Sequence, residues 1–291
     1  GRYAIFDKAM HEQAVARLQL ENDLRRAIER QEFILYYQPI VSLKTGWIVG
    51  FEALIRWQHP TQGIISPVKF IPIAEETGLI IPLGAWVLQK ACHQLAIWKE
   101  SIGIENYSNK NLNISNTFKN NYPLSISVNL SSKQFLQSDL VEQISQILRE
   151  TRLDASSLKL EITESAIMQN TESATAMLLE LRAKNIQLCL DDFGTGYSSL
   201  SYLHRFPIHT LKIDKSFVSR IGYENDHTEI VRAIIALAHA LGMDAIAEGI
   251  EDATQLSQLR ALNCEYGQGY YFSRPVNAET AGQLLVNFRP W

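Results

Sequence analysis

The stretch Leu188-Cys-Leu-Asp-Asp-Phe-Gly-Thr-Gly-Tyr-Ser198 places two adjacent carboxylates directly after a short apolar run. An apolar run of this length that follows a helical pattern is typical of a buried strand. Two anions side by side are unfavourable unless a cation neutralises them. Oxygen ligands of this kind suit hard divalent ions such as magnesium or manganese. Asp191 and Asp192 therefore predict a metal site at one end of an α/β domain, and the glycines Gly194 and Gly196 fit a turn.

The rest of the chain repeats this unit of a short apolar segment and a helical pattern. The predicted strands are Phe33–Ile40, Ile48–Ile55, Leu124–Leu130, Leu158–Ile162, Ile186–Leu190, Thr210–Ile213, Asp244–Ala247 and Gln268–Phe272. The predicted helices between them include Leu83–Trp98, Gln134–Arg149, Ala174–Lys184, Ile230–Leu241 and Ala253–Leu262. Such alternation predicts a parallel α/β architecture. Eight strands in roughly 250 residues favour a closed, TIM-like (β/α)8 barrel. The connection over 41–47 is too short for a crossover helix, so the first two strands are predicted to pair antiparallel.

The composition limits the class of protein. The chain has 291 residues, of which 46% are hydrophobic, and this suffices for a large core. The net charge of −4 gives no overall basic field for a nucleic-acid polymer or a membrane surface. The three cysteines, Cys92, Cys189 and Cys264, are far apart and predict reduced thiols rather than disulfides or a zinc site. No apolar run is long enough to span a bilayer. We therefore expect a cytoplasmic location, with any membrane anchor of a longer protein outside this sequence.

Two segments differ from the barrel pattern. Residues 11–30 form an amphipathic helical pattern, so we expect a linker or N-terminal helix over 1–31 and a barrel over 32–291. Ser101–Tyr122 is rich in asparagine and serine and predicts a long surface loop, to which we assign no function. The chain begins without a methionine, which suggests a piece of something longer.

Polar residues recur near the carboxyl ends of the predicted strands, where the active site of a barrel forms. Hard oxygens for one divalent cation are available from Glu52, Asn129, Glu161 and Asp191, and for a second from Asp191, Asp192 and Glu248. Two ions about 4 Å apart can hold a phosphodiester for in-line attack. Arg56 suits a phosphate oxygen, Lys212 suits the attacking water or the developing charge, and Glu248 suits the general base. The residue types therefore predict metal-assisted phosphodiester hydrolysis.

Each residue also has an ordinary interpretation. Glu248 alone would more often be a solvated or structural carboxylate, and pairing with a surface acid is the ordinary alternative for Arg56. The segment Asn129-Leu-Ser-Ser132 is also a helix start with a serine cap. The seven histidines show no paired ligand spacing and are interpreted as structural or surface residues. The combination of these residues favours the metal-dependent site over the separate ordinary interpretations.

A series of motifs spans residues 32–288 in a fixed order. They are Tyr37-Gln-Pro-Ile40, Phe51-Glu-Ala-Leu-Ile-Arg-Trp57, Ser127-Val-Asn-Leu-Ser131, Glu161-Ile-Thr-Glu164, Asp191-Asp-Phe-Gly-Thr-Gly196, Leu211-Lys-Ile-Asp214, Ala247-Glu-Gly-Ile-Glu251 and Gln268-Gly-Tyr-Tyr-Phe-Ser-Arg-Pro275. In order and content this series resembles the EAL domain, the bacterial phosphodiesterase family that hydrolyses cyclic di-GMP to linear pGpG. Ordered motifs of this number are specific, whereas Glu52-Ala-Leu54 alone would not be.

The resemblance implies a role for each matching position. It implies metal ligands at Glu52, Asn129, Glu161, Asp191 and Asp192, and a catalytic pair at Lys212 and Glu248. It implies substrate-binding positions at Gln38, Leu54, Arg56, Asp214 and Gln268. It implies supporting acids at Glu164, which steadies the loop after the fifth strand, and Glu251. The implied cofactor is magnesium or manganese, with two ions expected, and calcium is expected to inhibit because its coordination is larger and looser.

The resemblance also concerns the longer protein. Phe6-Asp-Lys-Ala-Met-His11 is similar to the joint that follows a GGDEF domain, so we expect the C-terminal part of a GGDEF–EAL signalling protein with sensor segments upstream. The family commonly forms homodimers. Two other readings remain open at this point: a receptor that binds cyclic di-GMP without cleaving it, and an interaction module with neither property. Receptors of this type typically lose an acidic ligand, and none is missing here.

Overall fold

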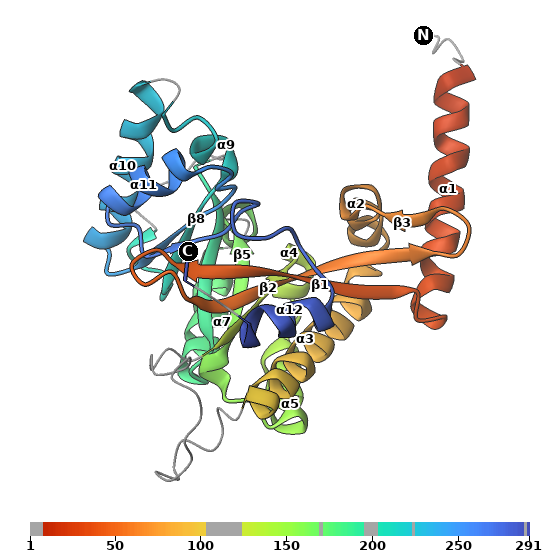
Figure 1. The fold of residues 1–291 in the computed structure, drawn as a ribbon. Coiled ribbons are helices and arrows are strands. Elements are labelled where there is room, and N and C mark those ends of the chain that lie inside the picture. Colours follow the sequence, from red (N-terminus) through yellow and green to blue (C-terminus); the bar gives the residue numbers. More distant parts are fainter. Residues whose placement is uncertain (1–7, 103–123, 169–170, 195–202, 223–224, 288–289) are drawn as a thin grey trace.

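The computed structural model describes residues 8–102, 124–168, 171–194, 203–222, 225–287 and 290–291 (Figure 1). The strands are β1 (Phe33–Ser42), β2 (Ile48–His59), β3 (Gly63–Ile65), β4 (Ser125–Leu130), β5 (Leu158–Thr163), β6 (Gln187–Phe193), β7 (Thr210–Ile213), β8 (Asp244–Ala247) and β9 (Tyr266–Gly267). The longer helices are α1 (Lys8–Glu29), α2 (Pro67–Thr77), α3 (Ile80–Ile102), α5 (Leu140–Thr151), α7 (Thr171–Ala183), α10 (Asn225–Ala240), α11 (Ala253–Ala261) and α12 (Ala278–Val286). The short ones are α4 (Ser132–Phe135), α6 (Glu164–Met168), α9 (Lys215–Val218) and the 3₁₀ turn η3 (Ala155–Ser157).

The sheet is closed and contains one reversed strand. The strand order is β1-β9-β8-β7-β6-β5-β4-β2-β3, and pairing of β1 with β2 closes the barrel. Among the described strands, β3 pairs with β2 alone and so lies outside the closed ring. Eight strands therefore form a barrel, as predicted. β1 runs antiparallel to both of its barrel neighbours, and the other barrel strands pair in parallel. The predicted antiparallel first pair is confirmed, because a turn around Gly46 leaves no length for a crossover.

Strand pleating separates the apolar core from the polar interior of the barrel. In β5, Leu160 and Ile162 are fully buried on either side of Glu161 in the sequence. Successive side chains of a strand point to opposite faces, so the apolar pair packs toward the surrounding helices and the carboxylate points into the barrel. The core between barrel and helices is rich in rings, and Trp98 of α3 packs against Tyr37 and Phe51 with ring centroids 4.8 and 5.0 Å away.

The eighth barrel strand is present as β9, but its predicted bounds, Gln268–Phe272, were wrong. β9 covers only Tyr266–Gly267, and the following residues turn, with the Phe272 amide donating to the Gly269 carbonyl at 3.1 Å. The backbone of Gly269 lies directly against that of Ile250, where an added Cβ would come within 2.1 Å of the Ile250 carbonyl oxygen. The apolar composition of this segment reflects packing of a turn. The β3–α2 unit after β2 was not predicted either.

We expect the substitution Gly269→Ala to destabilise the fold by about 1–3 kcal/mol, the usual cost of overpacking. The new methyl group has no room against the Ile250 backbone, which also accepts the Tyr271 amide at 2.9 Å. Denaturant unfolding followed by circular dichroism measures the change. An unchanged midpoint would contradict the close approach seen in the structure.

The structure confirms some of the predictions made for the segments outside the barrel. α1 covers most of the predicted helix over 11–30, and its end packs on the barrel through the buried Leu24 and Ala27, while its start points away (Figure 1). The division into a linker over 1–31 and a barrel over 32–291 stays a prediction. Most of Ser101–Tyr122, and Gly196 with its neighbours, lie outside the described residues. Within the described residues, each helix is too short or too polar to cross a lipid bilayer.

Candidate functional site

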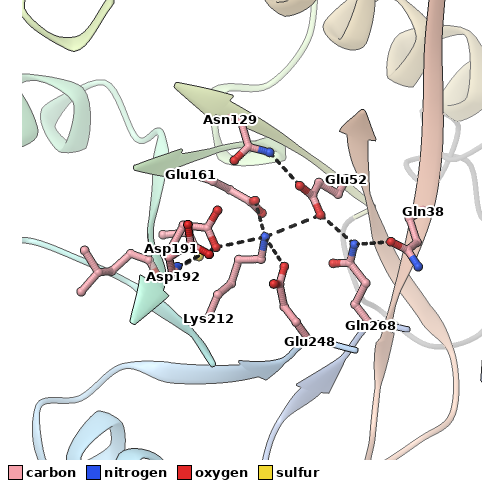
Figure 2. A network of polar contacts seen from close by, with 11 residues as sticks. Gln38, Glu52, Asn129, Glu161, Asp191, Asp192, Lys212, Glu248 and Gln268 are labelled. Carbon is pink, nitrogen blue, oxygen red and sulfur yellow. Dashed lines mark hydrogen bonds and ion pairs between the residues drawn. The ribbon is translucent and has the colours of Figure 1, made fainter. Parts of the chain in front are cut away.

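Four strands and one loop bring an ammonium group and four carboxylates together inside the barrel (Figure 2). Lys212 of β7 lies at the centre. Its Nζ is 2.6 Å from Glu161 Oε2, 2.6 Å from Glu248 Oε1, 3.3 Å from Asp191 Oδ1 and 3.5 Å from Glu52 Oε2. Glu52, Glu161 and Asp191 come from β2, β5 and β6, and Glu248 follows β8 directly. The parallel strands explain this convergence, because their carboxyl ends meet at one end of the barrel.

The charge of Lys212 is held by its partners. The side chain is 1% exposed. Burial by itself would lower the pKa of this lysine, but Glu161 and Glu248, followed by the other two carboxylates, raise it well above its usual range. The ammonium therefore stays protonated. Four carboxyl groups around one ammonium group repel one another when they are ionised, and a divalent cation relieves this repulsion.

Amide side chains fix the orientation of Glu52. Asn129 Nδ2 donates to Glu52 Oε1 at 2.7 Å, and Gln268 Nε2 donates to Glu52 Oε2 at 2.7 Å and to Gln38 Oε1 at 2.9 Å. Gln38 Nε2 in turn donates to the Ser273 carbonyl at 3.0 Å. Burial raises the pKa of Glu52, but the charge of Lys212 and these hydrogen bonds outweigh it and lower the pKa below its usual value. Glu52 is therefore held as an anion.

Two other carboxylates have raised pKa values. Burial, with repulsion from Glu52 and Asp191, raises the pKa of Glu161 to about 8 against the opposing pull of Lys212. The same causes raise the pKa of Glu248 to about 7. A carboxylate with a pKa near neutrality, next to a cleft, has the property expected of a group that takes up a proton in a reaction.

Asp191, Asp192 and Glu248 form a cluster that suits a metal ion. Each offers a carboxylate oxygen, and the three oxygens lie within 4.8 Å of one another. Neighbouring residues of a regular strand would point to opposite faces, but the register of β6 with β7 shifts between Leu190 and Phe193, and Asp192 has a φ of 53°. This irregularity turns both aspartates toward the same end of the barrel (Figure 2).

The donor set fits a hard cation. Within the described part of the chain, Glu161 Oε1 is buried and has no hydrogen-bond partner. A buried carboxylate oxygen without a partner is costly unless a ligand supplies one. Glu52 and Glu161 contact Lys212 here and lie outside the three-carboxylate cluster, so their role as metal ligands stays a prediction.

Two clefts open next to this centre and share Leu54. The first has a volume of about 290 Å³ and is lined by Gln38, Glu52, Leu54, Lys215, Glu248, Gly249, Glu251, Gln268, Gly269 and Tyr270. The second has a volume of about 580 Å³, is largely apolar, and includes Arg56, Asn129 and Asp192 in its lining. Lys215 and Tyr270 were missed from the sequence, although Tyr270 stands within a quoted motif.

The remaining predicted residues lie around the centre. Arg56 donates from Nη1 to the Ile55 carbonyl at 2.8 Å. The Asp214 side chain accepts from the Ser216 amide at 2.9 Å and caps α9. Glu164 begins α6 beside a small apolar cavity, and Glu251 is exposed at the outer edge of the first cleft. The structure therefore brings nine predicted residues into one polar network and leaves these four, with Leu54, at its periphery.

Comparisons with known proteins agree with this geometry. The family model described as EAL domain matches residues 21–275. The bifunctional diguanylate cyclase/cyclic di-GMP phosphodiesterase MucR of Pseudomonas aeruginosa is 40% identical over 98% of this chain, and the cyclic di-GMP phosphodiesterase NbdA of the same organism is 38% identical over 98%. The match covers only 38% and 34% of those two proteins, so the chain spans little more than a third of their length.

Solved structures of similar sequence share this fold. The phosphodiesterase part of MucR in complex with c-di-GMP has a TM-score of 0.81 at 40% identity, and the match covers 90% of this chain and 99% of that one. The EAL enzyme Bd1971, bound to cAMP and cyclic di-GMP, has a TM-score of 0.85 at 36% identity, over 94% of this chain and 70% of that one.

Proposed function

Because this chain belongs to the EAL domain family, we propose that it hydrolyses one phosphodiester bond of cyclic di-GMP and releases linear pGpG. The observation that carries the proposal is the cluster of Asp191, Asp192 and Glu248 beside Lys212, at the point where two clefts meet. Relatives whose names state this activity match nearly the whole of the chain.

Each residue of the centre has a part in this reaction. We propose that Glu248 takes the proton of the attacking water, which its raised pKa of about 7 favours at neutral pH. Lys212 neutralises negative charge that develops during attack, because it stays protonated in contact with Glu248 and Glu161. Asn129 and Gln268 keep Glu52 in place through their hydrogen bonds.

Divalent cations complete the proposed centre. Asp191 and Asp192 would hold magnesium or manganese beside Glu248, and we propose that Glu52, Asn129 and Glu161 contribute to a second ion. Such ions polarise phosphate oxygens and make water a stronger nucleophile at neutral pH. The proposed substrate contacts are Gln38, Leu54, Arg56, Asp214 and Gln268, with Glu164 and Glu251 in support.

The test is incubation of the purified chain with cyclic di-GMP and magnesium, manganese, calcium or a chelator, followed by separation of the products. We expect pGpG with magnesium or manganese, no product with the chelator, and inhibition by calcium, whose larger coordination shell does not fit ligands arranged for a smaller ion. An intact nucleotide with every metal and at every protein concentration would contradict the proposal. Tight binding without cleavage would then favour a receptor.

The whole protein is a further proposal. Because MucR carries a diguanylate cyclase as well, we propose a GGDEF domain upstream of this chain, and a homodimer as the assembled state. Sedimentation velocity of the chain at increasing concentration tests the second statement.

A further inference from the structure

The barrel opens between β2 and β4 at the edge that carries the candidate metal centre. The two strands pair in parallel as far as Ala53 and Val128, and among the described residues they form no pair beyond this point. Both strands continue, and the second cleft is lined by β2 on one side and by the end of β4 on the other. Asn129 lies on this end of β4 and is exposed to the cleft. On the side of β2, the end of β4 therefore depends on a support other than the sheet.

The buried side chain of Gln134, in α4, provides this support. Gln134 Oε1 accepts from the Ser131 amide at 3.3 Å and from the Ser131 hydroxyl at 3.0 Å, and the hydroxyl accepts from the Gln134 amide at 3.3 Å. Ser131 follows β4 directly and lies two residues after Asn129. Because α4 has only four residues, it cannot hold its geometry by itself. These hydrogen bonds, with the burial of Phe135, therefore fix the junction between β4 and α4.

Gly84, in α3, leaves the space that the Gln134 side chain occupies. Gly84 is buried, and a Cβ added to it would overlap the amide group of Gln134. A glycine inside a helix lowers the stability of the helix, so its presence in α3 is explained by this close approach and not by helix propensity. The Gln134 amide group is therefore held between α3 on one side and Ser131 on the other.

We propose that Gln134 is a positioning residue for the candidate metal centre and that Gly84 is required to accommodate it. By holding Ser131, Gln134 fixes the end of β4. It thereby keeps Asn129 next to Glu52, to which Asn129 Nδ2 donates at 2.7 Å (Figure 2). This inference rests on the proposed function, because Asn129 and Glu52 enter it as proposed ligands of a divalent cation. Gln134 and Gly84 both lie outside the motifs quoted from the sequence.

Gln134→Ala and Gly84→Ala test the inference, and calorimetric titration with manganese is the measurement. Gln134→Ala removes the acceptor of the Ser131 amide, and Gly84→Ala displaces the same side chain from the opposite side. Each variant should raise the dissociation constant for manganese by roughly tenfold, as expected when a contact that supports a metal ligand is lost. In the double variant no amide group is left for the Gly84→Ala methyl group to displace, so the loss should equal that of Gln134→Ala alone.

Three further measurements distinguish positioning from a general loss of stability. Gln134→Glu keeps an oxygen that can accept from Ser131, so its affinity for manganese should stay within about threefold of the wild type. Gln134→Ala should need roughly tenfold more magnesium for half-maximal turnover of cyclic di-GMP, and saturating magnesium should restore turnover to within about threefold. The matched control is Asn277→Ala, which removes another helix cap, since Asn277 Oδ1 accepts from the Thr280 amide at the start of α12. It should leave the manganese affinity unchanged.

The outcomes separate this inference from the proposed function. Unchanged manganese affinity in Gln134→Ala would overturn the role of Gln134 and leave the phosphodiesterase intact, and Gly84→Ala decides in the same way if Gln134→Ala does not fold. Losses that add in the double variant would also overturn it, because Gly84 would then act by a separate route. An equal loss in Gln134→Glu or in Asn277→Ala would overturn it as well. A wild type that neither binds manganese nor cleaves cyclic di-GMP would overturn the proposed function itself.

Discussion

Replacement of Glu248 by glutamine is expected to lower kcat for cyclic di-GMP by roughly 10²–10⁴-fold while the substrate still binds. Glutamine keeps the size and hydrogen-bonding shape of the side chain but cannot accept a proton. The loss should therefore appear in kcat and not in the affinity of the substrate. The structure supports this separation, because Glu248 touches Lys212 at 2.6 Å and lines the cleft next to the amide groups that would hold the nucleotide.

Product formation under saturating substrate measures kcat, and a binding titration with the same variant measures affinity. Glu180→Gln is a suitable control, since this glutamate is exposed on α7 and lines neither cleft. A variant at position 248 that turns over at a near-normal rate would refute the assignment of Glu248 as the base. A complete loss of cyclic di-GMP binding would instead show that the charge of Glu248 is needed to hold the other residues of the centre in place.

Replacement of Asp191 by asparagine is expected to weaken divalent-metal binding by roughly 10- to 100-fold and to lower turnover with it. The substitution removes one negative charge from the cluster with Asp192 and Glu248. It also removes an ion-pair partner of Lys212, at 3.3 Å, and changes the acceptor of the Asp192 amide hydrogen bond, at 2.9 Å. The variant should therefore need more metal before any product forms.

Calorimetric titration with manganese measures the affinity directly, and the dependence of turnover on magnesium concentration provides a second reading. Asp244→Asn is the control, because Asp244 begins β8 and so lies at the opposite end of the barrel. A position-191 variant with unchanged metal affinity would count against this aspartate as a ligand, whatever its activity.

The fold was predictable wherever a strand carried a clear signal in its own residues. The apolar runs of β5, β6 and β7 and the short connection after β1 led to a barrel with one reversed strand, and the structure agrees. The last strand was misplaced because Gln268–Phe272 has the composition of a strand but is bent by the contact of Gly269 with Ile250. That contact joins two distant segments and leaves no local pattern.

The members of the candidate site were predictable, but their arrangement was not. The position of each polar residue after an apolar run, and the resemblance to a family, selected the residues of the network. That Lys212 occupies the centre depends on distances across the barrel, which no spacing in the sequence encodes.

The reversed strand β1 has a consequence for the order of folding. β1 and β2 can form as a hairpin as soon as they leave the ribosome, but the other edge of β1 stays open until β9 and the segment around Val276 arrive, more than 200 residues later. Until then the nascent chain presents an unpaired strand edge, the type of surface on which aggregation begins. The hydrogen bond between Gln38 and Gln268 forms across this same closure. A chain that ends before β9 would therefore lack both the pairing that covers this edge of β1 and the hydrogen bond that joins Gln38 to the polar network.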